Sequence, residues 1–404
     1  MKVDVAIIGA GPAGLTAAVE IARNGLSAAV IDEYYRPGGR LLGQYYEDPY
    51  APADQRTWDG KKEADQLEEK ARSLGVHIFM NVTVWAVSGK WRVDMAGGDL
   101  PAITSNVLLL ATGSVEKALP VPGWTLPGVI SVGAAQTFTN LHHVAVGKKV
   151  MMAGIDPLSL SVMIELKNAG VHVAGMALPP MSSVTGKNKT PLQTVERLQD
   201  VAGLAPNLLV RKLGKFALKR FPKLTASGLR FNLLKVNNVP IHLRKAIVKI
   251  EGEKNVEAVT LQSVSVDGKP AGKTESVEVD TVCLSNGLYP LIDLAQTAGC
   301  RLVDMPELGG TVPLHGPDMT TKVSGLFVAG NITGIEGAKV AMAQGRLAAA
   351  SILQSLGKQA AITVDEAMTE VTNAREKAPL RFLPDIEEGR IKMNKIWEAE
   401  SAHG

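Results

Sequence analysis

The stretch VDVAIIGAGPAGLTAAVE, residues 3–20, decides the fold of this chain. Residues 3–8 are almost entirely apolar, as expected of a strand that is buried on both faces of a parallel sheet. The GxGxxG turn that follows consists of Gly9, Gly11 and Gly14. Such glycines allow a tight turn, a close approach of the backbone to a pyrophosphate, and close packing of helix on strand. The helix expected from Pro12 and Ala13 onward directs free N–H groups and its positive dipole end at the phosphates. The stretch therefore predicts a βαβ unit that binds a dinucleotide.

An acidic residue stands where such a unit holds its ribose. A second strand is expected at residues 27–31, and Asp32 follows it with Glu33 alongside. The distance from the glycines is the roughly 20 residues typical of the motif, and a carboxylate there accepts hydrogen bonds from ribose hydroxyls. It would also repel a 2′-phosphate. A βαβ unit that binds no nucleotide is the alternative interpretation.

A second glycine loop favours FAD over NAD as the nucleotide. RPGGRLLGQ, residues 36–44, lies just beyond the ribose acid and supplies further backbone N–H groups, including that of Gly39. Arg40 is expected either to meet a phosphate or to steady the loop. A second loop of this kind is more typical of FAD-binding folds, whose longer cofactor runs deep into the protein.

Three later segments extend the same site. Residues 77–87 are expected to form one strand, whose backbone near Val84 meets the adenine. Residues 325–353 are expected to form a strand, a glycine-rich turn and a long helix. The buried strand NVLLLATGS, residues 106–114, ends in a close-approach segment formed by Ala111, Thr112 and Gly113.

These motifs together resemble a known superfamily. GAGPAG (residues 9–14), ATGS (111–114) and GLFVAGNITG (325–334) are similar to the flavoproteins with two dinucleotide domains, such as glutathione and thioredoxin reductases. A narrower resemblance covers nearly the whole chain. PVPGWTLPGVISVGAAQTFTN (120–140) and PELGG (306–310) are similar to the FAD-containing subunits of multi-subunit amine dehydrogenases. That group includes opine oxidases, hydroxyproline and proline dehydrogenases, heteromeric sarcosine oxidase and hydrogen cyanide synthase.

The resemblance implies an α/β fold with two Rossmann-like dinucleotide-binding domains, glutathione reductase-like, the second inserted in the first. The FAD domain would comprise residues 1–118 and 286–355, and the inserted domain residues 119–285. Residues 356–404 would form a C-terminal helical arm.

The resemblance also implies how FAD is held. The first glycines would contact the pyrophosphate, and Asp32 or Glu33 the adenosine ribose. Gly330 and Asn331 would meet the ribityl and phosphate region; the superfamily usually has Asp at position 331, but Asn can still accept a hydrogen bond. The helix that begins at Gly337 and Ala338 would direct its N-terminus at the N1/C2 edge of the flavin, where it stabilises negative charge.

The second glycine motif is altered. KKVMMAG, residues 148–154, is expected to be a strand, but the motif positions after it are Gly154, Asp156 and Ser159. The Asp156 carboxylate would repel a pyrophosphate, and its side chain would prevent a close approach. As a helix N-cap it is ordinary. The next strand, residues 171–180, has neither the acid that NADH needs nor the arginine that NADPH needs; those positions are Ala174, Gly175, Met176 and Ala177.

We therefore predict that this domain does not bind NAD(P)H in the ordinary way. It would serve structure and the docking of partners, or hold a different nucleotide in a rearranged manner. A basic stretch at residues 181–236 is interpreted as a helical insertion. It would present either an acidic-partner or phosphate-binding face or an ordinary solvated helix face.

Composition limits the other classes of function. The chain has 404 residues, 46% hydrophobic residues and 40 glycines, which suits a packed α/β enzyme of two or three domains. A net charge of +3 gives no indication of a nucleic-acid partner. Cys283 and Cys300 form no CxxC, which disfavours a dithiol centre or a cysteine-bound iron–sulfur cluster. The start of the sequence enters a strand directly, and no apolar run reaches the roughly 20 residues of a spanning helix. We expect no signal peptide, no integral membrane segment and a cytoplasmic location.

Several other residues have two interpretations. His142 and His143 suggest a metal or proton relay, but a helix end is favoured because no partner cluster is visible. His315 would either reach the flavin edge or sit in a loop, and Lys339 would either approach the flavin or face the surface. The two large aromatics expected to pack around adenine and between domains are Trp85 and Trp124.

The function expected is that of an FAD-dependent, electron-transferring subunit of an amine or amino-acid dehydrogenase complex. The resemblance implies a partner that is an amine-oxidising flavoprotein subunit. A further candidate partner is an iron–sulfur subunit. The alternatives are a stand-alone NAD(P)H-dependent FAD oxidoreductase, a nonenzymatic nucleotide-binding scaffold, and direct amine oxidation by this chain alone. No catalytic side chain and no metal site are predicted.

Overall fold

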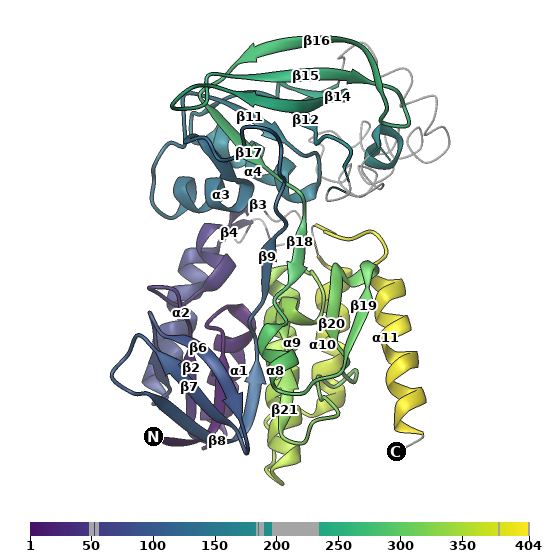
Figure 1. Cartoon of the computed structure of the whole chain (residues 1–404). Coiled ribbons are helices and arrows are strands. Elements are labelled where there is room, and N and C mark those ends of the chain that lie inside the picture. Colours follow the sequence, from purple (N-terminus) through teal and green to yellow (C-terminus); the bar gives the residue numbers. More distant parts are fainter. Residues whose placement is uncertain are drawn as a thin grey trace. The chain divides into compact units, whose positions relative to one another are not determined.

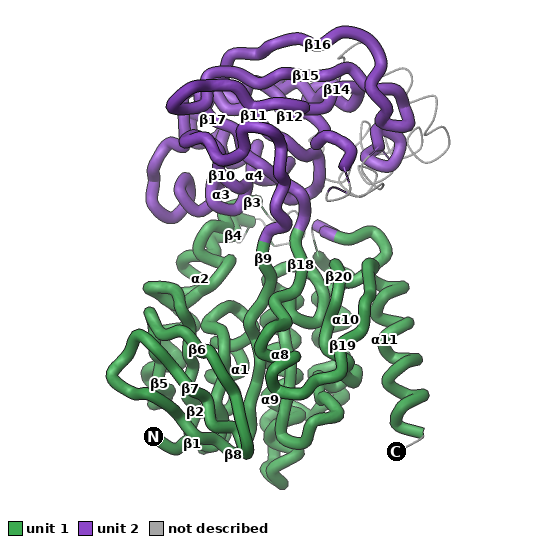
Figure 2. The backbone as a smooth tube through the Cα atoms, in the orientation of Figure 1, with its two compact units in different colours: residues 1–115, 288–379, 383–404 green, residues 116–287, 380–382 purple. Residues whose placement is uncertain are grey.

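The chain forms two compact units. The computed structural model describes residues 1–47, 52, 56–182, 185, 190–195, 234–378 and 380–402 (Figure 1). Unit 1 comprises Met1–Val115, Leu288–Pro379 and Leu383–Gly404, and unit 2 comprises Glu116–Gly287 and Leu380–Phe382 (Figure 2). Most of the basic stretch in the sequence, residues 196–233, lies outside the described residues.

Unit 1 is built on a seven-stranded sheet in the order β5-β2-β1-β8-β7-β6, with β21 also paired to β8. β1 pairs in parallel with β2 and β8, whereas β7 runs antiparallel to both of its neighbours, β6 and β8. β8 is long enough to share one edge between β7 near its start and β21 near its end. The strands are β1 (Lys2–Ile8), β2 (Ala28–Ile31), β5 (His77–Phe79), β6 (Thr83–Ser88), β7 (Arg92–Ala96), β8 (Ala102–Leu110) and β21 (Leu326–Val328).

The prediction of one continuous strand at residues 77–87 is wrong. The segment breaks after Phe79, and its two halves, β5 and β6, occupy opposite edges of the sheet. The turn passes through Asn81, whose φ of 57° is left-handed, a conformation that asparagine tolerates better than most residues. The Asn81 N–H donates to the Tyr34 carbonyl and the Val82 N–H to the Asp32 carbonyl. These bonds hold the break directly beside the predicted ribose acid.

The two faces of this sheet pack against different elements, since alternate residues of β1 point to opposite sides. Val5 and Ile7 enter a core shared with α1 and α9, whereas Ala6 and Ile8 pack on the other side against β7 and α8. The glycine in α9, Gly345, lets that helix lie against α1. The helices of unit 1 are α1 (Pro12–Arg23), α2 (Gly60–Ser73), α8 (Asp293–Thr297), α9 (Ala338–Ser355), α10 (Val364–Glu376) and α11 (Ile386–Ser401), with 3-10 turns η1 (Gly39–Gly43), η5 (Pro306–Leu308) and η6 (Gly330–Thr333).

The C-terminal helices belong to unit 1 and pack on its body. α10 begins in a capping box formed by Thr363 and Glu366, and its buried side chains join the core of α1 and α9. α11 contributes Ile386 and Met393 to a separate small core around η5 and β20. Three two-stranded sheets complete the unit and its junctions: β3 (Tyr45–Glu47) with β4 (Thr57–Asp59), β19 (Leu302–Met305) with β20 (Gly310–Pro313), and β9 (Ser114–Glu116) with β18 (Leu288–Pro290).

Unit 2 repeats the strand–helix–strand plan on an eight-stranded sheet in the order β10-β17-β11-β12-β14-β15-β16, with β13 paired to β14. β10, β17, β11 and β12 are parallel, and β14, β15 and β16 are antiparallel. Val150 and Met152 of β11 face α3 and α4, while Met151 and Ala153 face the other core. The elements are α3 (Val132–Asn140), α4 (Pro157–Asn168), β10 (Val129–Ser131), β11 (Lys149–Ala153), β12 (His172–Leu178), β13 (Lys235–Val236), β14 (Val239–Glu251), β15 (Ala258–Val264), β16 (Pro270–Glu278) and β17 (Thr281–Leu284).

The predicted α/β class with Rossmann-like parallel sheets is confirmed. In the described part of the chain, no helix combines the length and apolar character needed to cross a membrane.

Candidate functional site

The glycine turn after β1 has the geometry that a dinucleotide site requires. Gly9 has a φ of 108°, and a Cβ there would lie 2.2 Å from the Ala111 carbonyl oxygen, so the turn presses against the end of β8. A Cβ at Gly14 would lie 1.9 Å from the Gly9 oxygen, so helix and turn are in contact. At Gly11 a Cβ would meet nothing within 4 Å. Gly11 is also the N-cap of α1 and no side chain caps that helix. Among the described residues, no side chain therefore occupies the N-terminus of α1.

Asp32 organises this turn from the end of β2. One of its carboxylate oxygens accepts the Ala10 N–H at 2.7 Å, and the other accepts the Tyr34 N–H at 2.9 Å. Each oxygen keeps further lone-pair capacity for a ribose hydroxyl. Glu33 beside it is exposed. Asp32 is thus the better placed of the two predicted acids.

A cavity of about 290 Å³ opens beside the turn. The predicted site residues that line it are Gly9, Asp32, Glu33, Val84, Trp85 and Thr112, of which Asp32, Glu33, Val84 and Trp85 were predicted for the adenosine. The break between β5 and β6 explains how Val84 arrives there, because β6 returns along the far edge of the sheet. Sequence reasoning missed the opposite wall, which α8 and the residues before it provide: Leu291, Asp293, Leu294 and Thr297. These four residues lie in GLYPLIDLAQTAGCRL (residues 287–302), a stretch that resembles the amine dehydrogenase subunits but that was not assigned to the cofactor site.

The second glycine loop lies against the first. A Cβ at Gly39 would lie 3.0 Å from the Gly11 Cα, and the Gly38 N–H donates to the Ala10 carbonyl at 2.8 Å. Arg40 donates from Nε and Nη2 to the Ser114 carbonyl, at 3.3 and 3.2 Å. Arg40 thus links the loop to the first residue of β9, and its contact with a phosphate stays a prediction.

The segment after β21 contains the last of the predicted cofactor-binding residues. Gly330 packs on α1, since a Cβ there would lie 2.9 Å from the Ala13 Cβ. The Asn331 side chain accepts the Glu336 N–H at 3.1 Å and donates to the Ser114 hydroxyl at 3.5 Å. Gly337 is the N-cap of α9, ahead of Ala338, and a Cβ at Gly337 would meet nothing within 4 Å.

All of the predicted segments therefore meet at the carboxyl ends of β1, β2, β8 and β21. Gly113 also borders open space there, while the Thr112 hydroxyl donates to the Leu291 carbonyl at 2.6 Å. The carboxyl edge of a parallel sheet is where α/β proteins bind nucleotides.

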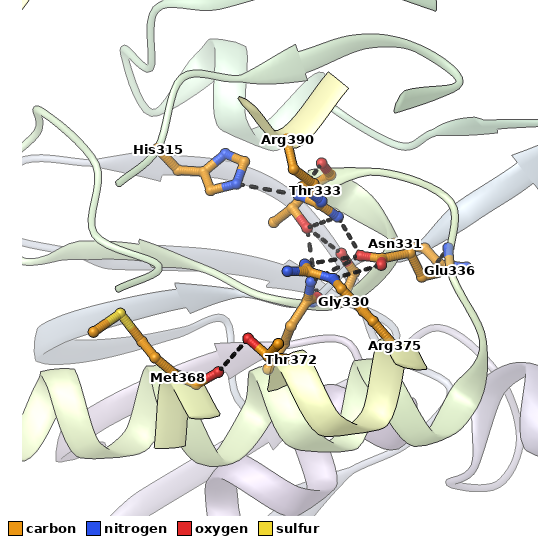
Figure 3. A network of polar contacts seen from close by, with 10 residues as sticks. His315, Gly330, Asn331, Thr333, Glu336, Met368, Thr372, Arg375 and Arg390 are labelled. Carbon is orange, nitrogen blue, oxygen red and sulfur yellow. Dashed lines mark hydrogen bonds and ion pairs between the residues drawn. The ribbon is translucent and has the colours of Figure 1, made fainter. Parts of the chain in front are cut away.

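A buried ion cluster behind the loop of residues 330–337 was not foreseen (Figure 3). Glu336 pairs with Arg375 of α10 at 2.7 Å and with Arg390 of α11 at 2.5 Å. Arg390 also donates to the Thr333 carbonyl at 2.8 Å. Gln344 connects the cluster to the loop, since its Oε1 accepts the Gly330 N–H at 2.9 Å and its Nε2 donates to Glu336 at 3.2 Å.

Charge governs the protonation of this cluster. Burial alone would raise the pKa of the Glu336 carboxyl, but the two guanidinium groups and their hydrogen bonds hold that pKa below its ordinary value. Burial and the Arg390 charge lower the pKa of His315 to about 3. The imidazole is therefore neutral at pH 7. Nδ1–H is assigned as donor to the Pro313 carbonyl at 2.8 Å, leaving Nε2 to accept from Arg390 at 3.4 Å.

Other predicted candidates are placed as follows. The Lys339 ammonium lies 5.0 Å from the centre of the Trp58 ring, and the Trp58 indole donates to Gln44 at 3.0 Å. The His142 ring packs near that of Phe138. Among the described residues no group of three or more histidine, cysteine or acidic side chains could hold a metal ion. The exposed tryptophan of unit 2 is Trp124.

Side chains of unit 2 itself occupy the altered glycine motif and form hydrogen bonds with its N–H groups. Asp156 is the N-cap of α4, and its Oδ1 accepts the Ser159 N–H at 2.9 Å. Its Oδ2 accepts the Ser285 hydroxyl at 2.6 Å. The Ser159 hydroxyl in turn accepts the Asp156 N–H, which completes a capping box. N–H groups that would face a pyrophosphate in unit 1 are thus satisfied internally in unit 2.

Comparison with known proteins now adds to this geometry. A family model described as pyridine nucleotide-disulphide oxidoreductase matches residues 3–345. An opine oxidase subunit of Agrobacterium tumefaciens is 30% identical over 365 residues, which cover 87% of this chain and 66% of that protein. Hydrogen cyanide synthase subunit HcnB of Pseudomonas aeruginosa is 28% identical, covering 96% of this chain and 78% of that one. The chain thus spans only part of the length of the opine oxidase subunits: 66% for A. tumefaciens, 63% for one subunit of Rhizobium meliloti and 76% for that of R. meliloti strain 1021.

Solved structures share the fold. L-proline dehydrogenase from P. horikoshii superposes with a TM-score of 0.65 at 21% identity, covering 93% of this chain and 59% of that one. Thioredoxin reductase from T. acidophilum gives a TM-score of 0.62 at 19% identity, covering 88% of this chain and 99% of that one. The resemblance drawn from the motifs is confirmed.

Proposed function

The chain belongs to the pyridine nucleotide-disulphide oxidoreductase family, and from this membership we propose that it is an FAD-binding, electron-transferring subunit of an amine or amino-acid dehydrogenase. One observation carries the proposal. The glycine turn of unit 1 is open at Gly11, whereas its counterpart in unit 2 is occupied by the Asp156 carboxylate and its partners. Electrons would therefore enter and leave through the dinucleotide site of unit 1. They would not come from a nicotinamide bound to unit 2.

The residues of unit 1 fit an extended FAD. Side chains are absent and space is free at Gly11, Gly113 and Gly337, which lie at the ends of three different elements. The first glycine turn, with Gly39 and Arg40, would hold the pyrophosphate. Asp32 and Glu33 would bind the adenosine ribose, with the adenine in the cavity beside Val84. The remaining contacts would come from Ala111, Thr112, Gly330, Asn331 and Ala338.

The chain's own contribution to the reaction is positioning and electrostatics. FAD, when bound, supplies the redox chemistry. The N-terminus of α9, capped only by Gly337, would direct its N–H groups and dipole at the flavin and favour negative charge there. By the resemblance to multi-subunit amine dehydrogenases, the amine itself would be oxidised in a partner subunit.

Names of the relatives support the substrate class. Opine oxidase and sarcosine oxidase, two of the enzymes to which the relatives belong, are named for amine or amino-acid substrates. We propose that the partner is an amine-oxidising flavoprotein subunit, and that a further partner is an iron–sulfur subunit. For unit 2 we propose a structural and docking role without ordinary NAD(P)H binding.

Anaerobic spectroscopy tests the proposal. The purified chain should carry FAD, identified by its visible absorption and by chromatography after release. NADH and NADPH should leave that absorption unchanged, whereas proline, sarcosine or an opine should bleach it only with the co-purified partner polypeptides present.

Each rival has its own outcome. Bleaching by NADH or NADPH alone would replace the proposal with a stand-alone oxidoreductase. Bleaching by an amine without any partner would assign amine oxidation to this chain. A chain that binds no FAD at any concentration would be a scaffold.

A further inference from the structure

We propose that the buried cluster of Glu336, Arg375 and Arg390 sets the reduction potential of the flavin, and that Arg390 and Arg375 are positioning residues supplied by the C-terminal helices. The inference rests on the proposed function, since it requires FAD in unit 1. It goes further by giving residues 356–402 a role in the redox site in addition to packing.

The position of the cluster is the first argument. Glu336 directly precedes Gly337, the N-cap of α9, and its N–H donates to Asn331. Gln344, one of the partners of Glu336, holds the N–H of Gly330. The cluster therefore bonds to both ends of the loop that is proposed to face the cofactor. Any shift of Glu336 would move that loop.

Burial is the second argument. The side chains of Glu336, Arg390 and Arg375 are 7%, 12% and 27% exposed. The Arg390 Nε has no partner among the described residues, although its two other nitrogens are bonded. Taking such charges out of water is costly, and a buried ion pair is often less stabilising than apolar residues of the same size. Stability alone is therefore a poor explanation for three buried charges at this place.

The balance of charge is the third argument. Two guanidinium groups face one carboxylate, and the neighbouring imidazole of His315 is neutral, so the cluster carries one excess positive charge. A low-dielectric interior screens such a charge weakly. Reduction adds negative charge to the flavin, and the excess positive charge therefore favours the reduced form. Without the arginines, the Glu336 carboxylate at the same helix N-terminus would oppose it.

The test measures the midpoint potential of the bound FAD in the full-length protein, by anaerobic equilibration with a reference dye. Arg390→Met should make two-electron reduction at least tenfold less favourable, a fall of about 30 mV. Glu336→Gln should shift the equilibrium at least as far in the opposite direction. Arg390→Lys, which keeps the charge, should recover most of the wild-type potential.

A matched control lies on the same helix. Lys392 is exposed and pairs with Glu307 and Glu388, so Lys392→Met removes a positive charge of α11 at the surface and should leave the potential unchanged. Arg375→Met repeats the main test at a less buried position, where the loss of folding is less severe. Its potential should fall as well.

The outcomes separate the two proposals. Potentials that stay at the wild-type value in Arg390→Met, Arg375→Met and Glu336→Gln would overturn this inference and leave the proposed function intact. A shift of the potential in the same direction in all three variants would also overturn it. Loss of an arginine and loss of the glutamate change the charge in opposite ways, so a shift in one direction would indicate a purely structural role. A wild-type chain unable to bind FAD would overturn the proposed function, and this inference with it.

Discussion

Individual glycines in the first turn have separate tasks, although the motif reads as one unit. Gly14 is confined by the backbone, since a Cβ there would lie 1.9 Å from the Gly9 oxygen. Gly11 has a φ of −75°, which any residue adopts, and a Cβ would meet nothing within 4 Å. Packing within the protein thus explains Gly14 and leaves Gly11 unexplained. A bound pyrophosphate is the reason we propose for Gly11.

Alanine at each glycine should separate these tasks. Gly14→Ala should lower the free energy of unfolding of the flavin-free protein by about 3 kcal/mol or more, because backbone atoms must move. Gly11→Ala should change the free energy of unfolding by less than about 1 kcal/mol. Alanine is a poorer N-cap than glycine and destabilises the folded chain, but it also lowers the entropy of the unfolded chain, which offsets that loss. Affinity for FAD should nevertheless fall at least tenfold in Gly11→Ala. Urea melts and flavin fluorescence titrations measure both, and an unchanged FAD affinity would contradict the proposed site.

Glu165 is a buried acid of unit 2 that no sequence pattern flagged. Its side chain lies between α3 and α4 and accepts hydrogen bonds from Gln136 at 3.0 and 3.1 Å, from Ser161 at 3.0 Å, and from Asn140. Burial raises its pKa from 4.5 to about 7, and the hydrogen bonds only partly oppose that rise. The folded chain therefore holds a proton at this site that the unfolded chain has already released.

A pH dependence of stability follows. Between pH 4.5 and 7 the folded state binds more protons than the unfolded state, so the free energy of unfolding should fall as pH rises through that range. Glu165→Gln should remove this fall and make the variant more stable than wild type above pH 7, by up to about 3 kcal/mol. The Asn140 amide can flip to accept from the new amide. Urea melts of both proteins from pH 4 to 8 measure the effect, and parallel curves would refute it.

Among the elements, α4 depends most visibly on its first residue. Asp156 caps the helix and also accepts the hydroxyl of Ser285, which directly follows β17. Asp156→Ala should therefore lower the free energy of unfolding by about 1–2 kcal/mol, a cost typical of a lost N-cap. Asp156→Asn keeps an acceptor for the Ser159 N–H and should recover most of it. Thermal melts of the three proteins decide the matter, and equal stability of Asp156→Ala and wild type would show that the cap contributes nothing.

Local patterns predicted most elements, because their causes are local. The N-cap role of Asp156 followed from its place between a strand and Pro157, and the structure shows it. The strand break at residues 80–82 could not be anticipated, since an apolar alternation continues through Asn81. Residues 77–87 form two strands because β5 pairs with β2 and β6 pairs with β7, and these contacts lie outside the segment.

The sequence did not predict contacts between residues that are distant along the chain. Glu336 and Arg390 are 54 residues apart, and Glu336 and Arg375 are 39 apart. Arg375 lies in no recognised motif, and Arg390 lies in the tail FLPDIEEGRIKMNKIWE (residues 382–398), which carries the family resemblance but indicates no partner for the arginine; charged residues on a C-terminal helix ordinarily face water. The open glycine turn could be predicted because its residues adjoin in sequence. The cluster behind it could not, because tertiary packing alone unites its members.

For the whole molecule, the two units have separate cores. The cores of unit 2 gather α3, α4 and the strands of its own sheet. Its segment enters through β9 and leaves through β18, and these two strands pair with each other. A fragment of residues 116–287 therefore has neighbouring ends and a complete sheet. We expect it to fold alone, although three residues, Leu380–Phe382, group with unit 2 in the intact chain.

Circular dichroism and urea melts of that fragment test the expectation. A single cooperative transition with native-like α/β content is the expected result. The N-terminal part of unit 1, residues 1–115 alone, should stay unfolded, because it lacks β21 and α9. A fragment 116–287 without a cooperative transition would mean that unit 2 needs unit 1 in order to fold.

The division of unit 1 between the two ends of the chain also orders events during translation. β8 ends at Leu110, and its parallel neighbour β21 begins only at Leu326. At ordinary elongation speeds the ribosome needs roughly 10–40 s to make the intervening stretch. Throughout that interval the nascent N-terminal segment, up to Leu110, would display a bare strand edge and an uncovered face of α1. Chaperones would find their target there until β21 and α9 have been made.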